Sequence, residues 1–332
     1  MANSDPTIDQ LDGLGSLRTS VGFRHRNFRE LTVAAALFVL LLLLAAFAPH
    51  FFDAQPLISL LTAAAPKLVL ACGVTLVIIC RQIDISIGSL FAASATYSGL
   101  AFAAGMSYVS SLGIGLLVGI VGGAVNGILV AGLRLPSIVV TLAMMVTIRE
   151  VLRLQQQGIF ITLPHGVQWF GRSMIAGQVA VCFIALLLLV SLAWGMRHLA
   201  VGRFIYAIGS DAEAARLAGM RPQWVTFLVF VLMGFAAGLA AVLNMVQSPQ
   251  VDPNSGRGLE LEVIAAVVVG GVAISGGRGN LWGVFAGLGL LVCIRPALTY
   301  AGVPPYWEKA IQGAIILGAV VADGMRNQKE RV

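Results

Sequence analysis

RHLAVGRFIYAIGSDAEAARLAGMRPQ, residues 197–223, is a polar and basic interval in the middle of a chain that is otherwise mostly apolar. Two apolar runs flank it, residues 179–196 and 224–246. Both are close to the length of about 20 residues that a helix needs to cross a hydrocarbon core of about 30 Å. A polar loop between two such runs predicts a surface presented to something soluble. We interpret it as the docking surface for a motor that the chain itself lacks.

The composition of the whole chain excludes a soluble globular fold. Of its 332 residues, 58% are hydrophobic and 11% are charged, and the mean hydropathy is +0.91. Soluble domains carry about 25% charged residues. Long continuous apolar runs favour helices over a barrel of short alternating strands. Because backbone groups in lipid must be satisfied within the protein, the sequence predicts an all-α polytopic membrane protein.

Ten apolar runs are candidate transmembrane helices: 31–48, 57–80, 87–102, 109–133, 138–151, 179–196, 224–246, 261–274, 281–300 and 306–322. An even number of crossings places both termini on the same side of the membrane. This predicts an N-terminal tail over residues 1–30, a membrane domain over 31–323 with the loop 197–223 inside it, and a C-terminal tail over 324–332.

The basic residues favour a cytoplasmic location for both termini. With that topology the inner segments hold 14 of the 21 Lys and Arg residues: Arg18, Arg24, Arg26, Arg29, Arg81, Arg134, Arg197, Arg203, Arg216, Arg221, Arg278, Arg326, Lys329 and Arg331. The other seven lie in outer loops or near span ends: Lys67, Arg149, Arg153, Arg172, Arg257, Arg295 and Lys309. This bias is typical of cytoplasmic loops, so the net charge of +6 does not indicate nucleic acid as a partner.

The sequence offers no catalytic residues, no metal site and no cofactor site. It contains no GxxxxGK[ST] phosphate loop, and Gly276-Gly277-Arg278-Gly279 lacks the Lys-Ser/Thr that would make one. The four histidines are scattered, and the four cysteines all lie in apolar runs without paired spacing. Hydrolytic or redox chemistry is therefore not expected of this chain.

An acidic residue stands out between the second and third apolar runs, in Ile83-Asp84-Ile85-Ser86-Ile87-Gly88-Ser89. A charge at such a place is costly and tends to be functional. We favour a structural role for Asp84, with Ser86 beside it, in which the carboxylate caps the following helix at its positive end. Direct contact with a substrate and a proton relay are the alternatives.

Two runs look short or interrupted. The run 57–80 contains Pro66 and Lys67, and the run 261–274 is followed at once by Ser275-Gly276-Gly277-Arg278-Gly279. Broken apolar segments often mark the substrate path of a transporter. A proline can also simply kink a packed helix.

Inside the loop 197–223, Gly202 and Gly209 are predicted to break the chain into two short pieces. A short helix is then expected over Ala212–Leu217. Ser210 or Asp211 is its predicted N-cap, Glu213 lies in its first turn, and Gly219 ends it. Pro222 stops it before the next span. Such a helix can insert into a groove on a soluble partner, and a plain amphipathic connector is the alternative.

Four segments in order resemble one family of membrane proteins: residues 75–95, 123–142, 202–220 and 259–283. They resemble the permeases of bacterial ABC importers for monosaccharides, the ribose, xylose, arabinose and galactose branch. Arg81-Gln82 before Ile83-Asp84, and the ending Val303-Pro304-Pro305-Tyr306-Trp307, are closest to the sub-branch that imports rhamnose or the autoinducer-2 furanone.

The resemblance implies a multi-pass protein of the bacterial inner membrane with the ten-helix fold of the vitamin B12-type importers. It implies a second permease copy or a paralogue, a sugar-binding protein outside, and an ATPase with tandem nucleotide domains that binds ATP and Mg and docks on residues 202–220. The residues expected to couple that ATPase to transport are Gly202, Gly209, Ser210, Asp211, Glu213, Arg216 and Gly219.

Three polar residues at membrane depth are candidates for lining the path: Asn126, Thr141 and Asn244. Each can equally be a hydrogen-bonding link between helices. The main alternative function is a secondary transporter driven by an ion gradient, in which coupling would rest on acidic residues: Glu150, Glu260, Glu262 and Glu308. A membrane-embedded enzyme is disfavoured because no catalytic constellation appears.

Overall fold

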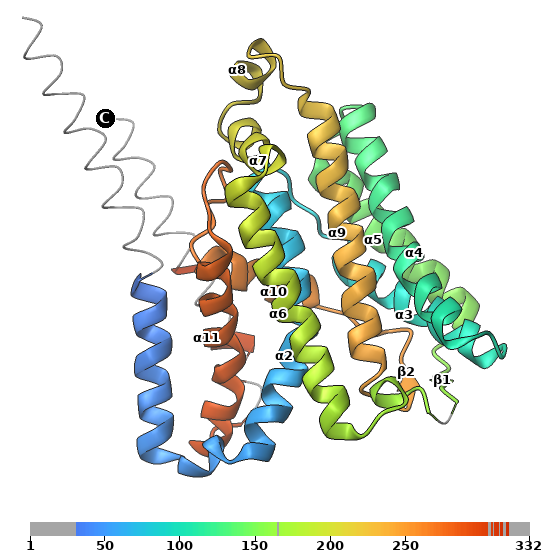
Figure 1. The fold of residues 1–332 in the computed structure, drawn as a ribbon, viewed down its shortest axis with the longest axis vertical. Helices are drawn as coiled ribbons and strands as arrows, with labels where there is room; N and C mark the ends of the chain where they lie inside the picture. The colour runs from blue at the N-terminus through green and yellow to red at the C-terminus, as the bar shows by residue number, and fades with distance from the viewer. Residues whose placement is uncertain are drawn as a thin grey trace, which may run out of the picture.

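The computed structural model describes residues 31–164 and 166–304, together with 307, 309–311, 313–314 and 317–318. The predicted tails 1–30 and 324–332 and part of the tenth apolar run lie outside the described residues. The described chain is a bundle of helices, with α7 and α8 at one end and a two-stranded ribbon at the other (Figure 1).

The long helices of the bundle are α2 (Ala54–Ile79), α4 (Tyr108–Gly127), α5 (Ser137–Gln156), α6 (Met174–His198), α9 (Pro222–Met245) and α11 (Leu281–Tyr300). The shorter ones are the first helix Leu31–Phe47, α3 (Ile87–Ala103), α7 (Ala200–Ser210), α8 (Ala212–Leu217) and α10 (Leu259–Val269). Two 3-10 turns, η1 (Pro49–Phe52) and η3 (Gln168–Gly171), and a π-helical turn, η2 (Ile128–Gly132), complete the helices. The strands β1 (Ile161–Thr162) and β2 (Gln250–Val251) pair antiparallel, with Ile161 opposite Val251.

The prediction of a mostly helical, polytopic membrane protein is confirmed. Each apolar run that ends before residue 301 coincides with a helix. Five helices of the described chain are long and apolar enough to cross a membrane: α2, α4 continued through η2, α6, α9 and α11.

The glycines of the fourth run let α4 and α9 approach closely. A Cβ atom added to Gly119 would lie 2.3 Å from the Gly234 carbonyl oxygen, and one added to Gly123 would lie 2.3 Å from the Phe230 carbonyl oxygen. Small residues at such contacts are how membrane helices gain packing without a hydrophobic driving force between them.

The two runs that looked interrupted differ in the structure. For 57–80 the structure agrees with the alternative of a proline within a packed helix, because α2 continues through a buried Pro66. The prediction of a short run was right for 261–274, because α10 stops at Val269 and the chain turns at Gly270 and Gly271, the latter at φ +97°. With 11 residues, α10 is about 16 Å long, too short to cross a bilayer.

The helices α3 and α10 both begin inside the molecule, at the same place. Gly88, in the first turn of α3, lies against the carbonyl oxygen of Gly256 and the carboxylate of Glu260, at the start of α10. From there α3 runs to the ribbon, where Gly99 contacts Ile161 and Val251. The chain after α10 runs to the opposite end, where Gly277 lies against α7.

Candidate functional site

The helix α7 corrects one prediction about the loop 197–223. Gly202 and Gly209 do not break it, because α7 is continuous from Ala200 to Ser210 and contains both. Both glycines are buried and packed against backbone. An added Cβ would lie 2.4 Å from the Met196 carbonyl oxygen at Gly202 and 1.7 Å from the Ile79 carbonyl oxygen at Gly209. The missing side chains of these glycines let neighbouring backbone approach α7 closely, and they do not create a turn.

The helix α8 has the predicted bounds, Ala212–Leu217. Of the two predicted caps, Asp211 is the one used: its Oδ1 accepts from the backbone N–H of Glu213 at 2.9 Å and of Ala214 at 3.0 Å. Ser210 is instead the last residue of α7. Gly219, at φ +84°, provides the left-handed turn that ends the helix.

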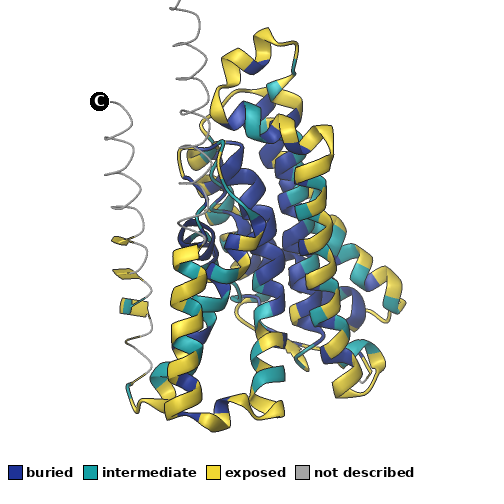
Figure 2. Ribbon diagram, turned by 60° about the vertical axis from the view of Figure 1, so that its left-hand side comes forward, coloured by how far each residue is buried: buried dark blue, intermediate teal, exposed yellow. Residues whose placement is uncertain are grey.

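The surface of α8 is exposed except for Ala215, at the end of the bundle (Figure 2). Arg216 donates to Glu213 from Nε at 2.9 Å, and this bond holds the pKa of the Glu213 carboxyl below its usual value. Leu217 is 77% exposed. A rigid, capped helix with an oriented ion pair and an apolar tip is suited to insertion into a groove on a partner.

The end of α7 contacts both the connection that leads to α3 and the turn that follows α10. Gly209 packs on Ile79, where the segment 80–86 leaves α2 for α3. The N–H of Gly277, in the turn after α10, donates to the Ile79 carbonyl oxygen at 2.8 Å, and the Tyr206 hydroxyl donates to the Gly279 carbonyl oxygen at 2.9 Å. The helix α7 is therefore in direct contact with both connections.

Asp84 and Ser86 lie together just before α3. Asp84 is 2% exposed, and its Oδ1 accepts from the Ser86 N–H at 2.8 Å and from the Ser86 hydroxyl at 2.6 Å. Asn126, on α4, donates from Nδ2 to the Ser86 hydroxyl oxygen at 2.8 Å. The carboxylate thus orders the residue that precedes α3 rather than binding N–H groups of its first turn.

Of the three residues predicted to line the path, two border the same segment and one does not. Thr141, on α5, accepts from the Ile85 N–H at 3.1 Å, and Asn126 binds Ser86. On α9, the position level with Asn126 is marked by Phe227, which contacts the neighbouring Gly127. Asn244 is exposed and lies 17 residues farther along the same helix. That separation is about 25 Å along the helix, so the structure does not bring Asn244 to the others.

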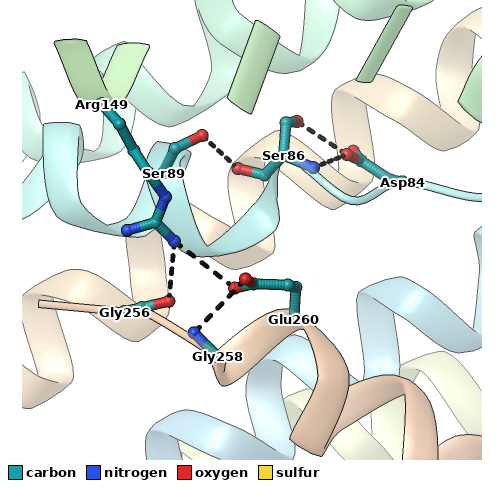
Figure 3. Close-up of polar contacts among 7 residues, drawn as sticks. All are labelled: Asp84, Ser86, Ser89, Arg149, Gly256, Gly258 and Glu260. Atoms are coloured by element: carbon teal, nitrogen blue, oxygen red, sulfur yellow. Dashed lines mark hydrogen bonds and ion pairs between the residues drawn. The ribbon is translucent and has the colours of Figure 1, made fainter. Parts of the chain in front are cut away.

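A charged pair joins α5 to α10 (Figure 3), and of its two members the sequence indicated only Glu260, as a coupling residue of the ion-driven alternative. Arg149 Nη2 lies 3.5 Å from Glu260 Oε2 and donates to the Gly256 carbonyl oxygen at 3.2 Å. The Gly258 N–H donates to Glu260 Oε1 at 3.3 Å. The side chains are only 18% and 11% exposed. A signal was present, because charges beside apolar runs tend to be functional, but their pairing depends on tertiary contact.

The other carboxylates of the ion-driven alternative are also paired. Glu262 forms an ion pair with Lys67 on α2, and Glu150 pairs with Arg153 at the surface of α5 at 2.8 Å. Glu308 lies outside the described residues. No group of three or more His, Cys, Asp or Glu within the described part of the chain is arranged to hold a metal ion.

Comparison with known proteins identifies the relatives of this chain. The family described as "Branched-chain amino acid transport system / permease component" matches residues 57–320. The autoinducer 2 import system permease protein LsrC of Yersinia pseudotuberculosis serotype IB (strain PB1/+) is 34% identical over 300 residues, which cover 90% of this chain and 86% of that protein. The protein of the same name from Yersinia pestis (strain Pestoides F) matches with the same identity, 34% over 300 residues. No solved structure matches the chain.

Proposed function

The chain belongs to the branched-chain amino acid transport system / permease component family, and we propose that it imports a small sugar-like solute, driven by ATP. It is a multi-pass permease of the bacterial inner membrane. The proposed solute is a rhamnose-like monosaccharide or a furanone like autoinducer-2. The relatives named for autoinducer 2 import support this choice, as do Arg81-Gln82 and the ending Val303-Pro304-Pro305-Tyr306-Trp307.

The observation that carries the proposal is α8, a capped and exposed helix joined through α7 to the interior of the bundle. An ATPase with tandem nucleotide domains docks there and binds the ATP and Mg. Ser210, Asp211, Glu213 and Arg216 couple the two proteins. A second copy or a paralogue completes the channel, and a sugar-binding protein docks at the ribbon end. Ten crossings with both termini inside, as in the vitamin B12-type importers, complete the arrangement.

The mechanism follows from the contacts of α7. Closure of the ATPase pushes α8, whose cap holds it as a rigid body. Because Gly209 packs directly on Ile79 and lies beside Gly277, the push reaches the connections before α3 and after α10 without passing through flexible chain. The helices α3 and α10 then shift relative to α5, and access alternates between the two sides.

The test is reconstitution of the permease in proteoliposomes with its ATPase and its binding protein. Uptake of labelled rhamnose or autoinducer-2 is expected to require ATP and to continue after ionophores collapse the proton and sodium gradients. Uptake driven by a gradient alone, without the ATPase, would overturn the proposal in favour of the secondary transporter. The paired state of Glu150, Glu260 and Glu262 speaks against that outcome.

A further inference from the structure

We propose that the place where α3 and α10 begin is a binding site for an uncharged, hydroxyl-rich solute within the membrane. Asp84, Asn126 and Glu260 supply acceptors, and Arg149 supplies donors. This inference deepens the proposed function and rests on it for the identity of the solute. It goes beyond it by assigning a site within this chain.

The helices α3 and α10 meet at their first turns. Their N-terminal ends converge so closely that a Cβ on Gly88 would lie 2.3 Å from the Gly256 carbonyl oxygen and 2.4 Å from Glu260 Oε2. The free N–H groups and the positive ends of both helix dipoles point to one region. Discontinuous helices that end near the middle of the bilayer form the substrate sites of many transporters.

Two buried acceptors near the start of α3 lack donors. Asp84 Oδ2 and Asn126 Oδ1 make no hydrogen bond with any described residue, and Glu260 Oε2 has only its ion-pair contact with Arg149 at 3.5 Å. The three residues are 2%, 0% and 9% exposed. Nearly all buried polar groups in native proteins have a partner. Two unpartnered acceptors, and a third with only a long ion-pair contact, therefore call for donors that come from outside the chain.

Hydroxyl groups fit these acceptors better than a cation does. Arg149 already places a positive charge 3.5 Å from Glu260, and both helix ends add positive potential. A further cation would be repelled by these groups. A hydroxyl donates to a carboxylate or an amide oxygen and also accepts from a guanidinium, so adjacent hydroxyls of one small solute satisfy both kinds of group.

The charged pair forms the accessible edge of the site. The side chains of Arg149 and Glu260 retain 18% and 11% exposure, whereas Asp84 and Asn126 are 2% and 0% exposed. In Figure 3 the pair stands beside the start of α3, with Asp84 and Ser86 on the other side of that helix turn. A solute that enters from the side of α5 meets Arg149 first.

The first test is cysteine labelling at Ser89, which is buried in the first turn of α3 and donates to the Ser86 carbonyl oxygen. In the reconstituted complex, Ser89→Cys is expected to react with a small water-soluble methanethiosulfonate during ATP turnover. Rhamnose or autoinducer-2 at millimolar concentration is expected to slow the reaction at least fivefold. Ser98→Cys, buried farther along α3 against Ser111, is the matched control and should stay unlabelled.

The second test compares two glutamates of one helix turn. Glu260→Gln is expected to lower ATP-driven uptake at least tenfold and to change the relative rates for rhamnose and ribose, with ATPase association unchanged. Glu262→Gln, whose partner is Lys67, is expected to change uptake less than twofold and to keep the relative rates. If either glutamate variant does not accumulate in the membrane, the labelling of Ser89→Cys by itself tests the proposed site.

The outcomes separate this inference from the proposed function. ATP-dependent uptake with an unreactive Ser89→Cys would overturn the site and leave the importer intact. If sodium slows the labelling of Ser89→Cys and neither rhamnose nor autoinducer-2 does, the buried acceptors bind a cation. This result would also overturn the proposed solute site. Solute-protected labelling with gradient-driven uptake would support the site and overturn the ATP-driven importer.

Discussion

Two Glu–Arg ion pairs, Glu213 with Arg216 and Glu260 with Arg149, differ in how far they are exposed to solvent. The first pair spans one turn of α8, and its side chains are 65% and 62% exposed. The second joins α10 to α5, and its side chains are 11% and 18% exposed. Water screens an exposed pair, so it adds little to stability and stays available to a partner. A desolvated charge depends on its partner, so the buried pair ties two helices together.

The largest effect is expected from breaking the buried pair. Arg149→Leu leaves the Glu260 carboxylate without its counter-charge and should cost about 3 kcal/mol of stability, the low end for a buried pair because some exposure remains. The midpoint of thermal unfolding in detergent measures this. The double variant Arg149→Leu with Glu260→Leu should recover most of the loss, because no charge is then left unpaired. An unchanged midpoint for the single variant would mean that the pair is as well solvated as the one on α8.

The next effect concerns the contact that links the two regions. Gly209→Ala forces a methyl group toward the Ile79 carbonyl oxygen, where an ideal Cβ would be 1.7 Å away. The overpacking should cost about 2 kcal/mol and should lower ATP-driven uptake. Gly113→Ala is the matched control, because it is also a helical glycine but has nothing within 4 Å of its Cβ position. Equal unfolding midpoints and equal uptake for the two variants would show that α7 does not press on the end of α2.

A smaller effect is expected at the cap of α8. Asp211→Ala removes the acceptor for two backbone N–H groups and should cost about 1 kcal/mol of local helix stability. Faster amide hydrogen exchange over residues 212–217 should report it, while the rest of the bundle exchanges as before. Ser210→Ala serves as the control, since Ser210 makes no cap bond to α8. Unchanged exchange after Asp211→Ala would show that the helix is held by other contacts.

Reversing the charge of the exposed Glu213 is expected to have the smallest effect on stability. Its effect on partner binding should be large. Glu213→Lys should leave the unfolding midpoint of the permease unchanged and abolish co-purification of the ATPase. Glu150→Lys reverses the acid of another exposed pair of the same spacing, with Arg153 on α5. It should not affect co-purification. Normal assembly with Lys at position 213 would make α8 a simple connector.

Local features of the chain were predicted where the cause is local. The bounds of α8, its acidic cap and its terminal glycine follow from neighbouring residues, and the structure confirms them. The helical apolar runs follow from composition alone. Gly202 and Gly209 were misinterpreted because a glycine that breaks a helix and one that admits a neighbouring backbone look the same in sequence. The neighbour at Gly209 is Ile79, far away along the chain.

The sequence by itself therefore determined that this is a helical membrane protein with a capped, exposed helix on one loop, because hydropathy and capping act over about 20 residues or fewer. Only the tertiary structure decided that α3 and α10 begin at the same place and that Arg149 meets Glu260 there. Those contacts join segments more than 100 residues apart, and close packing of backbones, not local propensity, sets them.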